Sequence, residues 1–174
     1  MKTVADYIMT IPDFPKPGVM FRDVTSLLNN PDGFQLAVDE LSRRLEGVDY
    51  DLIAGIEARG FFFGSPIAYN QHKGLIAVRK QGKLPRETVA ATYDLEYGSA
   101  TIEIHKDSIK PGQKVVIIDD LIATGGTIEA AIRLVEQLGG EVVKVLFLVE
   151  LTDFERSEKL NSYNIESLVQ YEGA

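Results

Sequence analysis

Four short apolar runs recur along the chain, separated by stretches with the periodicity of amphipathic helices. Each run is typical of a buried strand, and together they occupy Asp51–Ile56, Leu75–Val78, Val115–Ile118 and Val142–Val149. Strand and helix alternation of this kind predicts an α/β fold, with a mostly parallel central sheet flanked by helices on both sides.

Two helices are predicted between these strands. One begins near Pro31 and Asp32 and presents an apolar face made of Phe34, Val38, Leu41 and Leu45. The other ends at Gly139 and Gly140 and presents an apolar face made of Ile128, Ala131, Ile132, Val135 and Leu138. Both faces are suited to pack on a sheet.

Two segments depart from this alternation. Thr88–Tyr93 and Thr101–His105 alternate polar and apolar side chains around a short turn, which predicts an antiparallel hairpin projecting from the main sheet. Tyr7–Phe21 is rich in proline and glycine, so we expect an irregular segment lying over the body. No repeat or linker divides the chain, and 174 residues fit a single domain spanning residues 1–174.

Composition narrows the possible partners. The net charge of −8 argues against general binding to nucleic acid or to an anionic membrane, although a local basic cluster lies between Arg79 and Arg86. The chain has no cysteine, which rules out disulfides and thiolate metal sites and fits a reducing compartment. Because the N-terminus lacks the apolar run of a signal peptide, we expect a cytoplasmic protein.

The most informative stretch is Lys114–Thr127, where an apolar strand ends in Asp119 and Asp120 and a loop of small residues leads into a helix. In an open α/β sheet, ligands bind beyond the carboxyl ends of the strands, where this loop must lie. Gly125 and Gly126 leave backbone N–H groups open to close approach, and a helix N-terminus attracts anions. This loop is therefore predicted to bind a phosphate.

The paired aspartates predict a second ligand group beside that phosphate. Their charge would repel the phosphate itself, whereas ionised carboxylates accept hydrogen bonds from the vicinal hydroxyls of a ribose. A Walker-type hydrolase strand is an alternative, but neither G-x-x-x-x-G-K-[ST] nor the G-x-G-x-x-G of dinucleotide-binding folds occurs in the chain. A purely structural Asp–Asp turn is the remaining alternative.

Residues 115–127 closely resemble the motif with which type I phosphoribosyltransferases bind 5-phosphoribosyl pyrophosphate (PRPP). The resemblance implies the type I phosphoribosyltransferase fold, with a hood segment within about residues 1–30 and a mobile catalytic hairpin over about residues 87–105. It implies that Asp119 and Asp120 bind the ribose hydroxyls. It also implies that the 5′-phosphate is bound by Ala123, Thr124, Gly125, Gly126 and Thr127.

The turn Gly55–Gly60 follows the first strand and can aim backbone N–H groups and Arg59 at an anion. A plain strand-to-helix turn with a surface arginine is the alternative. In the resembling family this turn binds pyrophosphate, often through a non-proline cis peptide, expected here between Glu57 and Ala58. The resemblance thus assigns Ala58 and Arg59 to the PRPP site.

The basic cluster from Arg79 to Arg86 is either part of a solvated loop or a source of counter-charge for an anionic substrate. The resemblance implies that Lys83 binds PRPP and that Arg79 reaches the pyrophosphate in a neighbouring subunit's site. A homodimer is expected for that reason.

Pro12–Asp23 resembles the hood of the adenine-specific members of this family in particular. Phe21 offers an aromatic face on which a purine can stack, although Phe14 and Phe21 also read as simple core anchors. The resemblance implies that backbone groups of Met20 and Arg22 read the adenine edge, with Leu151 packing on its other face.

Glu96 lies in Tyr93–Gly98, at the tip of the predicted hairpin, and the resemblance makes it the candidate general acid or base. An exposed acidic residue without a role is the alternative. Arg59 and Lys83, together with Mg²⁺ held mainly by PRPP, are expected to stabilise the leaving pyrophosphate. A closing hairpin would also exclude water from the activated sugar.

The activity implied by the resemblance is transfer of the phosphoribosyl group from PRPP to adenine, giving AMP and pyrophosphate in purine salvage. Two alternatives remain open. A member specific for a 6-oxopurine would need donors where an adenine pocket accepts, and mismatched buried groups cost about 1–3 kcal/mol each. A PRPP-sensing DNA-binding regulator would want an additional basic domain, which this acidic single domain lacks.

Overall fold

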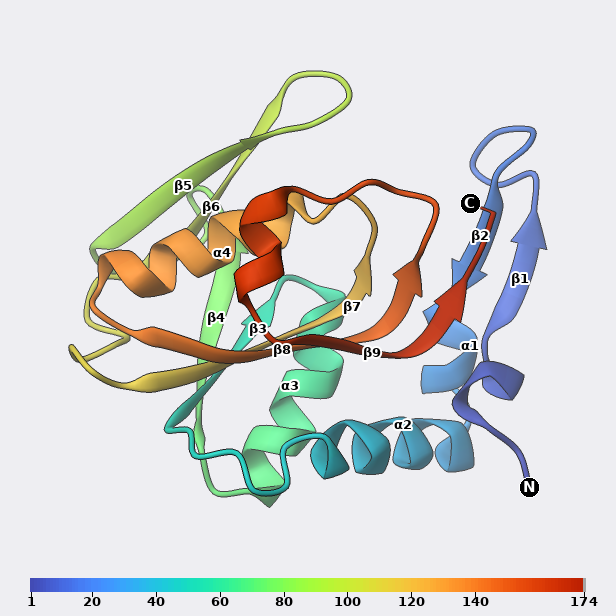
Figure 1. Cartoon of the computed structure of the whole chain (residues 1–174), viewed down its shortest axis with the longest axis horizontal. Helices are drawn as coiled ribbons and strands as arrows, with labels where there is room; N and C mark the ends of the chain where they lie inside the picture. The colour runs from blue at the N-terminus through green and yellow to red at the C-terminus, as the bar shows by residue number, and fades with distance from the viewer. Residues whose placement is uncertain (174) are drawn as a thin grey trace.

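The structure, a computed structural model, describes residues 1–173 and is built on one seven-stranded sheet in the order β5-β6-β4-β3-β7-β8-β9 (Figure 1). Strands β4, β3, β7, β8 and β9 pair in parallel, whereas β6 is antiparallel to both β4 and β5. The predicted α/β fold is confirmed, and the four apolar runs are β3, β4, β7 and β8. The strand bounds are β3 (Leu52–Ile56), β4 (Gly74–Lys80), β5 (Thr88–Asp94), β6 (Ser99–His105), β7 (Lys114–Ile122), β8 (Glu141–Leu151) and β9 (Ile165–Tyr171).

The helices and short 3-10 turns connect these strands. The helix predicted to begin near Pro31 and Asp32 begins at Pro31. The side chain of Asn30 caps it by accepting hydrogen bonds from the backbone N–H groups of Asp32 and Gly33. The second predicted helix ends just before Gly139, also as expected. The bounds are η1 (Val4–Tyr7), α1 (Val24–Leu28), α2 (Pro31–Arg43), α3 (Arg59–Asn70), α4 (Gly126–Gln137) and η2 (Glu158–Ser162).

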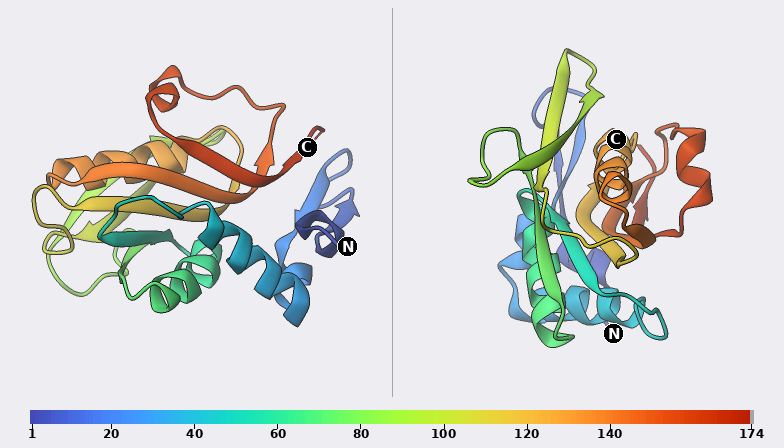
Figure 2. Two further views of the ribbon diagram at one scale, coloured as in Figure 1. Left: turned by 60° about the horizontal axis from the view of Figure 1, so that its bottom comes forward. Right: turned by 90° about the vertical axis from the view of Figure 1, so that its left-hand side faces the viewer.

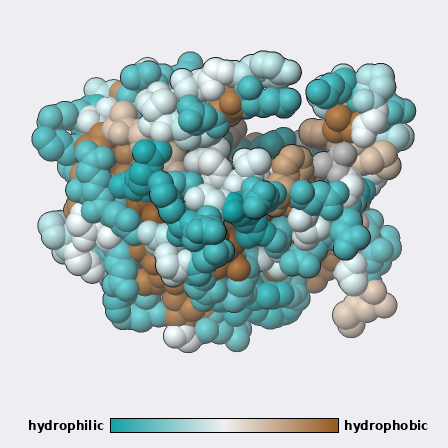
Figure 3. All heavy atoms as spheres, turned by 45° about the horizontal axis from the view of Figure 1, so that its top comes forward, coloured by the Kyte–Doolittle hydropathy of each residue, from teal (hydrophilic) through white to brown (hydrophobic). Residues whose placement is uncertain are grey.

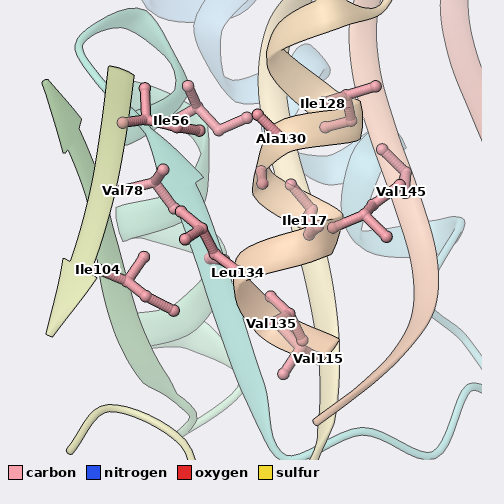
Figure 4. Packing of buried hydrophobic residues seen from close by; sticks show 14 of the residues in the cluster. Ile56, Val78, Ile104, Val115, Ile117, Ile128, Ala130, Leu134, Val135 and Val145 are labelled. Atoms are coloured by element: carbon pink, nitrogen blue, oxygen red, sulfur yellow. The ribbon is translucent and has the colours of Figure 1, made fainter. Parts of the chain in front are cut away.

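Helices cover both faces of the sheet (Figure 2). Successive side chains of a strand point to opposite faces, so Val115 and Ile117 of β7 pack under α4, while Val116 and Ile118 pack with α2 and α3. All four side chains are fully buried. Figure 4 shows how α4 lies over β3, β7 and β8 on its side of the sheet. This packing fixes the start of α4 at the end of β7.

The predicted hairpin is confirmed as β5 and β6, which project from the body in Figure 1. It is joined to the main sheet by two residue pairs, Arg79 opposite Glu103 and Lys80 opposite Ile102. The stem also rests on α4, where Arg133 donates a hydrogen bond to the carbonyl oxygen of Thr92 over 2.7 Å. The base of the hairpin is therefore held by both a strand and a helix.

The N-terminal segment is more regular than expected. Met9–Pro12 (β1) and Met20–Asp23 (β2) form a separate two-stranded antiparallel sheet, in which Ile11 faces Phe21. The expectation of an irregular Tyr7–Phe21 is wrong for these strands, because the prolines lie at a strand end and in the connecting loop rather than within a strand. The loop itself is tied by a hydrogen bond from the N–H of Gly18 to the carboxylate of Asp13.

The carboxyl ends of β3, β4 and β7 point to the same edge of the sheet, because these strands run in parallel. The hairpin and the loops after β7 and β8 gather at this edge (Figure 1). Figure 3 shows this side as largely hydrophilic, with a hollow between the body and the smaller lobe where Figure 1 draws β1 and β2. The candidate site is built here.

Candidate active site

The loop between β7 and α4 carries the predicted phosphate-binding residues. Gly125 occupies the N-cap of α4 with φ of 87°, a left-handed conformation that favours glycine. Its carbonyl oxygen accepts the first helical hydrogen bond, from the N–H of Glu129 over 2.9 Å. The next backbone N–H groups have no helical acceptor, so they and the helix dipole are available to an anion.

A cleft of about 720 Å³ opens beside this loop. One wall consists of residues 121–128, and the opposite wall is the hairpin segment Tyr93–Glu96. The structure therefore brings Glu96 together with all five predicted phosphate-loop residues. Phe147 and Phe154 complete the lining, with Asp119 at one end.

A second cleft of about 410 Å³ lies against the first. It is lined by the turn Ile56–Arg59 after β3, by both Asp119 and Asp120, and by Lys80 at the end of β4. The two clefts share four lining residues, namely Tyr93, Asp119, Leu121 and Thr127. The start of α4 and the arginine-bearing turn after β3 thus line two adjoining clefts that share a wall.

Arg59 at the start of α3 and Asp120 near the end of β7 form an ion pair. Asp120 is only 4% exposed, and the Nε atom of half-exposed Arg59 lies 2.7 Å from its Oδ2 atom. The contact lacks the angle of a hydrogen bond, so charge attraction holds it. It fixes the turn after β3 against the end of β7.

Asp119 is in a different electrostatic environment. Its Oδ1 atom accepts a hydrogen bond from the N–H of Asp120 over 2.8 Å. Burial raises the pKa of the Asp119 carboxyl well above its usual value, and the adjacent charge of Asp120 raises it further. Because Asp119 lines both clefts, a ligand that bridges them would contact its carboxyl group.

The turn after β3 contains the expected cis peptide between Glu57 and Ala58. The N–H of Glu57 donates to the carbonyl oxygen of Val78 over 2.9 Å, and its carboxylate accepts a 2.6 Å hydrogen bond from the Nε of Arg79. Arg79 therefore pairs with Glu57 within the chain. Lys83 is exposed in the loop after β4 and lines neither cleft.

The close approach of α3 to the end of β7 explains why a glycine, Gly60, occupies the second position of α3. A Cβ atom on Gly60 would lie 2.8 Å from the carbonyl oxygen of Ile118 and 3.1 Å from Oδ1 of Asp119. Only a residue without a side chain lets the helix start this near the end of β7.

The four residues predicted to bind the base lie in or near the hood. Phe21 packs edge-on against Phe14, with ring centroids 5.1 Å apart. The guanidinium of Arg22 stacks over Tyr171 of β9 at 4.1 Å and donates to the hydroxyl of Thr10. Met20 is exposed and Leu151 ends β8, and none of these four residues lines the two clefts. The residues predicted to bind the base therefore do not line the clefts that hold the residues predicted to bind phosphate.

Several cleft residues were not assigned to the site by sequence reasoning, among them Lys80 and Tyr93. Lys80 lines the smaller cleft, whereas the resemblance assigned Lys83, three residues further along the same basic cluster, to the PRPP site. Tyr93 lies on the shared wall of both clefts. Lys80 lies beside the cleft because it pairs with Ile102, where the end of β4 meets the hairpin. This pairing depends on strand register, which the sequence does not reveal.

Within residues 1–173, no cluster of three or more histidine or acidic side chains is arranged to hold a metal ion. No helix in the described part of the chain is both long and apolar enough to cross a membrane.

Comparison with known proteins identifies relatives over nearly the whole chain. Residues 23–170 match the model of the phosphoribosyl transferase domain. The adenine phosphoribosyltransferase of Agathobacter rectalis is 64% identical over 173 residues, which are 99% of each chain. That of Butyrivibrio fibrisolvens is 62% identical, over 99% of this chain and 96% of its own.

Solved structures agree with these relatives. The adenine phosphoribosyltransferase of Thermoanaerobacter pseudethanolicus superposes with a TM-score of 0.92 at 50% identity, covering 97% of this chain and 98% of the other. The enzyme of Giardia lamblia, in complex with 9-deazaadenine, gives a TM-score of 0.89 at 34% identity over 98% and 99% of the two chains. The chain therefore belongs to the phosphoribosyltransferase family, among the adenine phosphoribosyltransferases.

Proposed function

We propose that this protein transfers the 5-phosphoribosyl group of PRPP to adenine, forming AMP and pyrophosphate in purine salvage. The observation that carries the proposal is the pair of adjoining clefts with Asp119 on their shared wall. One end offers the N-terminus of α4 and the other offers Arg59. A ribose with a phosphate on one side and a pyrophosphate on the other matches this arrangement of groups.

The phosphate loop holds the 5′-phosphate in this proposal. The free N–H groups at the start of α4 and the hydroxyls of Thr124 and Thr127 donate hydrogen bonds to it. Asp119 and Asp120 accept hydrogen bonds from the ribose hydroxyls. Such contacts orient the anomeric carbon between the two clefts, which is the main contribution that positioning makes to catalysis.

Departure of pyrophosphate leaves positive charge on the ribose and negative charge on the leaving group. Arg59, together with the backbone at Ala58, stabilises the leaving group, and the basic residues Lys83 and Arg79 add counter-charge. We place Arg79 in the site of a neighbouring subunit, so the active species is a homodimer. Its pairing with Glu57 within the chain would then be exchanged for the anion.

Mg²⁺ fits the proposed site as an ion held mainly by the substrate. The carboxylates of Asp119 and Asp120 line the pyrophosphate-side cleft and are hard oxygen groups of the kind this ion prefers. When bound, Mg²⁺ supplies further charge neutralisation to the pyrophosphate oxygens.

The proton on the adenine ring must be removed or moved as the new C–N bond forms. Glu96 is proposed for this role, and its position on the wall of the larger cleft, facing the phosphate loop, supports the assignment. Closure of the hairpin tip would bring its carboxylate to the base and exclude water from the activated sugar.

Recognition of adenine is proposed for the hood. Phe21 and Leu151 would hold the ring between them, and backbone groups at Met20 and Arg22 would pair with its edge. The complex of the Giardia lamblia relative with 9-deazaadenine supports a purine as the base. Because none of the four residues lines the two clefts, the hood and the hairpin must approach each other when substrates bind.

An initial-rate assay with PRPP and Mg²⁺ tests the proposal, with adenine, hypoxanthine, guanine and xanthine offered separately. We expect AMP and pyrophosphate from adenine alone. Turnover of a 6-oxopurine would contradict the base assignment, and absence of any turnover would contradict the activity. Light scattering at assay concentration tests the dimer, and a 19.2 kDa species alone would contradict it. We also propose a cytoplasmic location, which fractionation of the native host would test.

A further inference from the structure

We propose that Leu160 is a positioning residue for PRPP binding, because it holds Gly125 of the phosphate loop in its left-handed conformation. The inference builds on the proposed function. It assigns a role to η2, the 3-10 turn after β8, which the sequence analysis did not connect to the site.

The contact between Leu160 and Gly125 is direct. A Cβ atom built on Gly125 would lie 2.5 Å from Cδ1 of Leu160, so the leucine fills the space where a side chain would begin. Leu160 is only 3% exposed. Side chains of Ile122 and Ile128 reach the same point at 3.8 and 3.7 Å, which closes the back of the loop. The open side of Gly125 faces the cleft of about 720 Å³.

The turn that carries Leu160 is fastened to α4, the helix that the phosphate loop begins. Tyr163 donates a hydrogen bond to Oε1 of Glu136 over 2.5 Å, and the ammonium of Lys159 lies 3.4 Å from Oε1 of Glu129. Both acidic partners are on α4. Within η2, the N–H of Leu160 donates to the carbonyl oxygen of Ser157 over 3.0 Å. These contacts hold η2 against α4 and so keep Leu160 packed on the phosphate loop.

This support matters because the loop binds phosphate with backbone N–H groups. Their directions depend on the φ and ψ angles of Gly125, and glycine alone does not restrict these angles. A side chain packed against the back of the residue limits the loop to one arrangement, so less conformational freedom is lost when the phosphate binds. Leu160 acts through the loop and does not touch the substrate.

The test compares Leu160→Ala with Leu45→Ala in the full-length protein. Leu45 is also 3% exposed, but it belongs to the cluster on the opposite face of the sheet. Both substitutions remove the same atoms from a buried site. We expect Leu160→Ala to raise the KM for PRPP by about 10- to 100-fold, as loss of exact positioning does, with little change in kcat or in the KM for adenine.

Leu45→Ala is expected to lower thermal stability without this selective effect on PRPP. A KM for PRPP that rises equally in both variants would overturn the inference, because general loosening would then explain it. So would an unchanged KM in Leu160→Ala. Should that variant not fold, Leu160→Met, which retains apolar bulk, and Leu160→Val, which shortens it, replace it. The KM for PRPP should then rise in the valine variant and stay near the wild-type value in the methionine variant.

The same experiment separates this inference from the proposed function. Turnover by the wild type and by Leu45→Ala establishes the activity independently of Leu160. Isothermal titration with ribose 5-phosphate gives a second readout, since this probe carries only the phosphate and the sugar. Its dissociation constant should rise for Leu160→Ala alone, and equal binding by all three proteins would overturn the inference even if catalysis is absent.

Discussion

Arg59 holds the buried carboxylate of Asp120, with its Nε atom 2.7 Å from Oδ2. The arginine starts α3 after one strand, and the aspartate lies near the end of the neighbouring strand. One ion pair therefore joins the start of α3 to the end of β7, beside the smaller of the two clefts. Arg59 thus balances a buried charge while it lines the smaller cleft, where the proposed function has its remaining N–H groups bind the pyrophosphate.

Replacement of Arg59 by alanine is expected to lower both stability and activity. Asp120 would remain buried without its counter-charge, which should cost about 1–3 kcal/mol, less than for a fully buried pair because Arg59 is half exposed. The KM for PRPP should rise as well. Urea denaturation and initial rates measure the two effects. The control Arg44→Ala removes an exposed ion pair with Glu166 far from both clefts and should leave kinetics unchanged.

Asp119→Asn is expected to stabilise the fold near neutral pH. The pKa of Asp119 is raised in the folded state by burial and by Asp120, so the folded protein binds this proton more tightly than the unfolded chain does. Its carboxyl therefore costs stability as pH rises above the unfolded value of 3.8, and the cost is complete above the raised folded pKa. Asparagine removes the charge and retains an oxygen for the N–H of Asp120.

Thermal unfolding of both proteins at pH 7 and at stepwise lower pH down to about 4, close to the unfolded value of 3.8, checks the sign of this effect. The melting temperature of Asp119→Asn should exceed that of the wild type at pH 7, and the difference should shrink toward pH 4. Activity should fall, because an amide is a weaker acceptor for ribose hydroxyls than a carboxylate. A variant that is less stable at pH 7 would contradict the assigned environment of Asp119.

Gly60→Ala is expected to separate α3 from β7. The new methyl group would lie 2.8 Å from the carbonyl oxygen of Ile118, and a backbone atom cannot move aside as a side-chain tip can. Overpacking of this kind costs about 1–3 kcal/mol and would displace Arg59 next to it. Gly64→Ala on the same helix is the matched control, because its nearest neighbour is a side-chain atom of Leu75 at 3.4 Å. It should be neutral or stabilising by up to about 1 kcal/mol.

Much of the sheet could be predicted from sequence because its central strands β3, β7 and β8 are buried on both faces. The apolar run before Asp119, followed by Gly125 and Gly126 and then by an amphipathic stretch, predicts a strand, a tight loop and a helix in that order. The hairpin was predictable for a related reason. The alternation of polar and apolar residues along the hairpin indicates that one of its faces is buried, and that face packs on α4.

The missed features depend on contacts between distant segments. The pairing of β1 with β2 was hidden by prolines at the end of β1 and in the connecting loop, and β9 alternates too weakly to be recognised. The ion pair between Glu57 and Arg79 joins the turn after β3 to the end of β4. The packing of Leu160 on Gly125 joins residues 35 positions apart. Neither leaves a local pattern, because sequence periodicity reports which face is buried and not what covers it.

Glu96→Gln tests the chemical role proposed for the hairpin tip. Glutamine has nearly the same shape but cannot exchange a proton at neutral pH, so kcat should fall by about 10²- to 10⁴-fold, the range that general acid–base groups contribute. The KM for PRPP should change little, because Glu96 lies opposite the phosphate loop and is not part of it. Glu46→Gln, an exposed acid in the turn after α2, is the matched control and should keep wild-type kinetics. Unchanged kcat in Glu96→Gln would remove this residue from the chemistry and leave the hairpin only its role in excluding water.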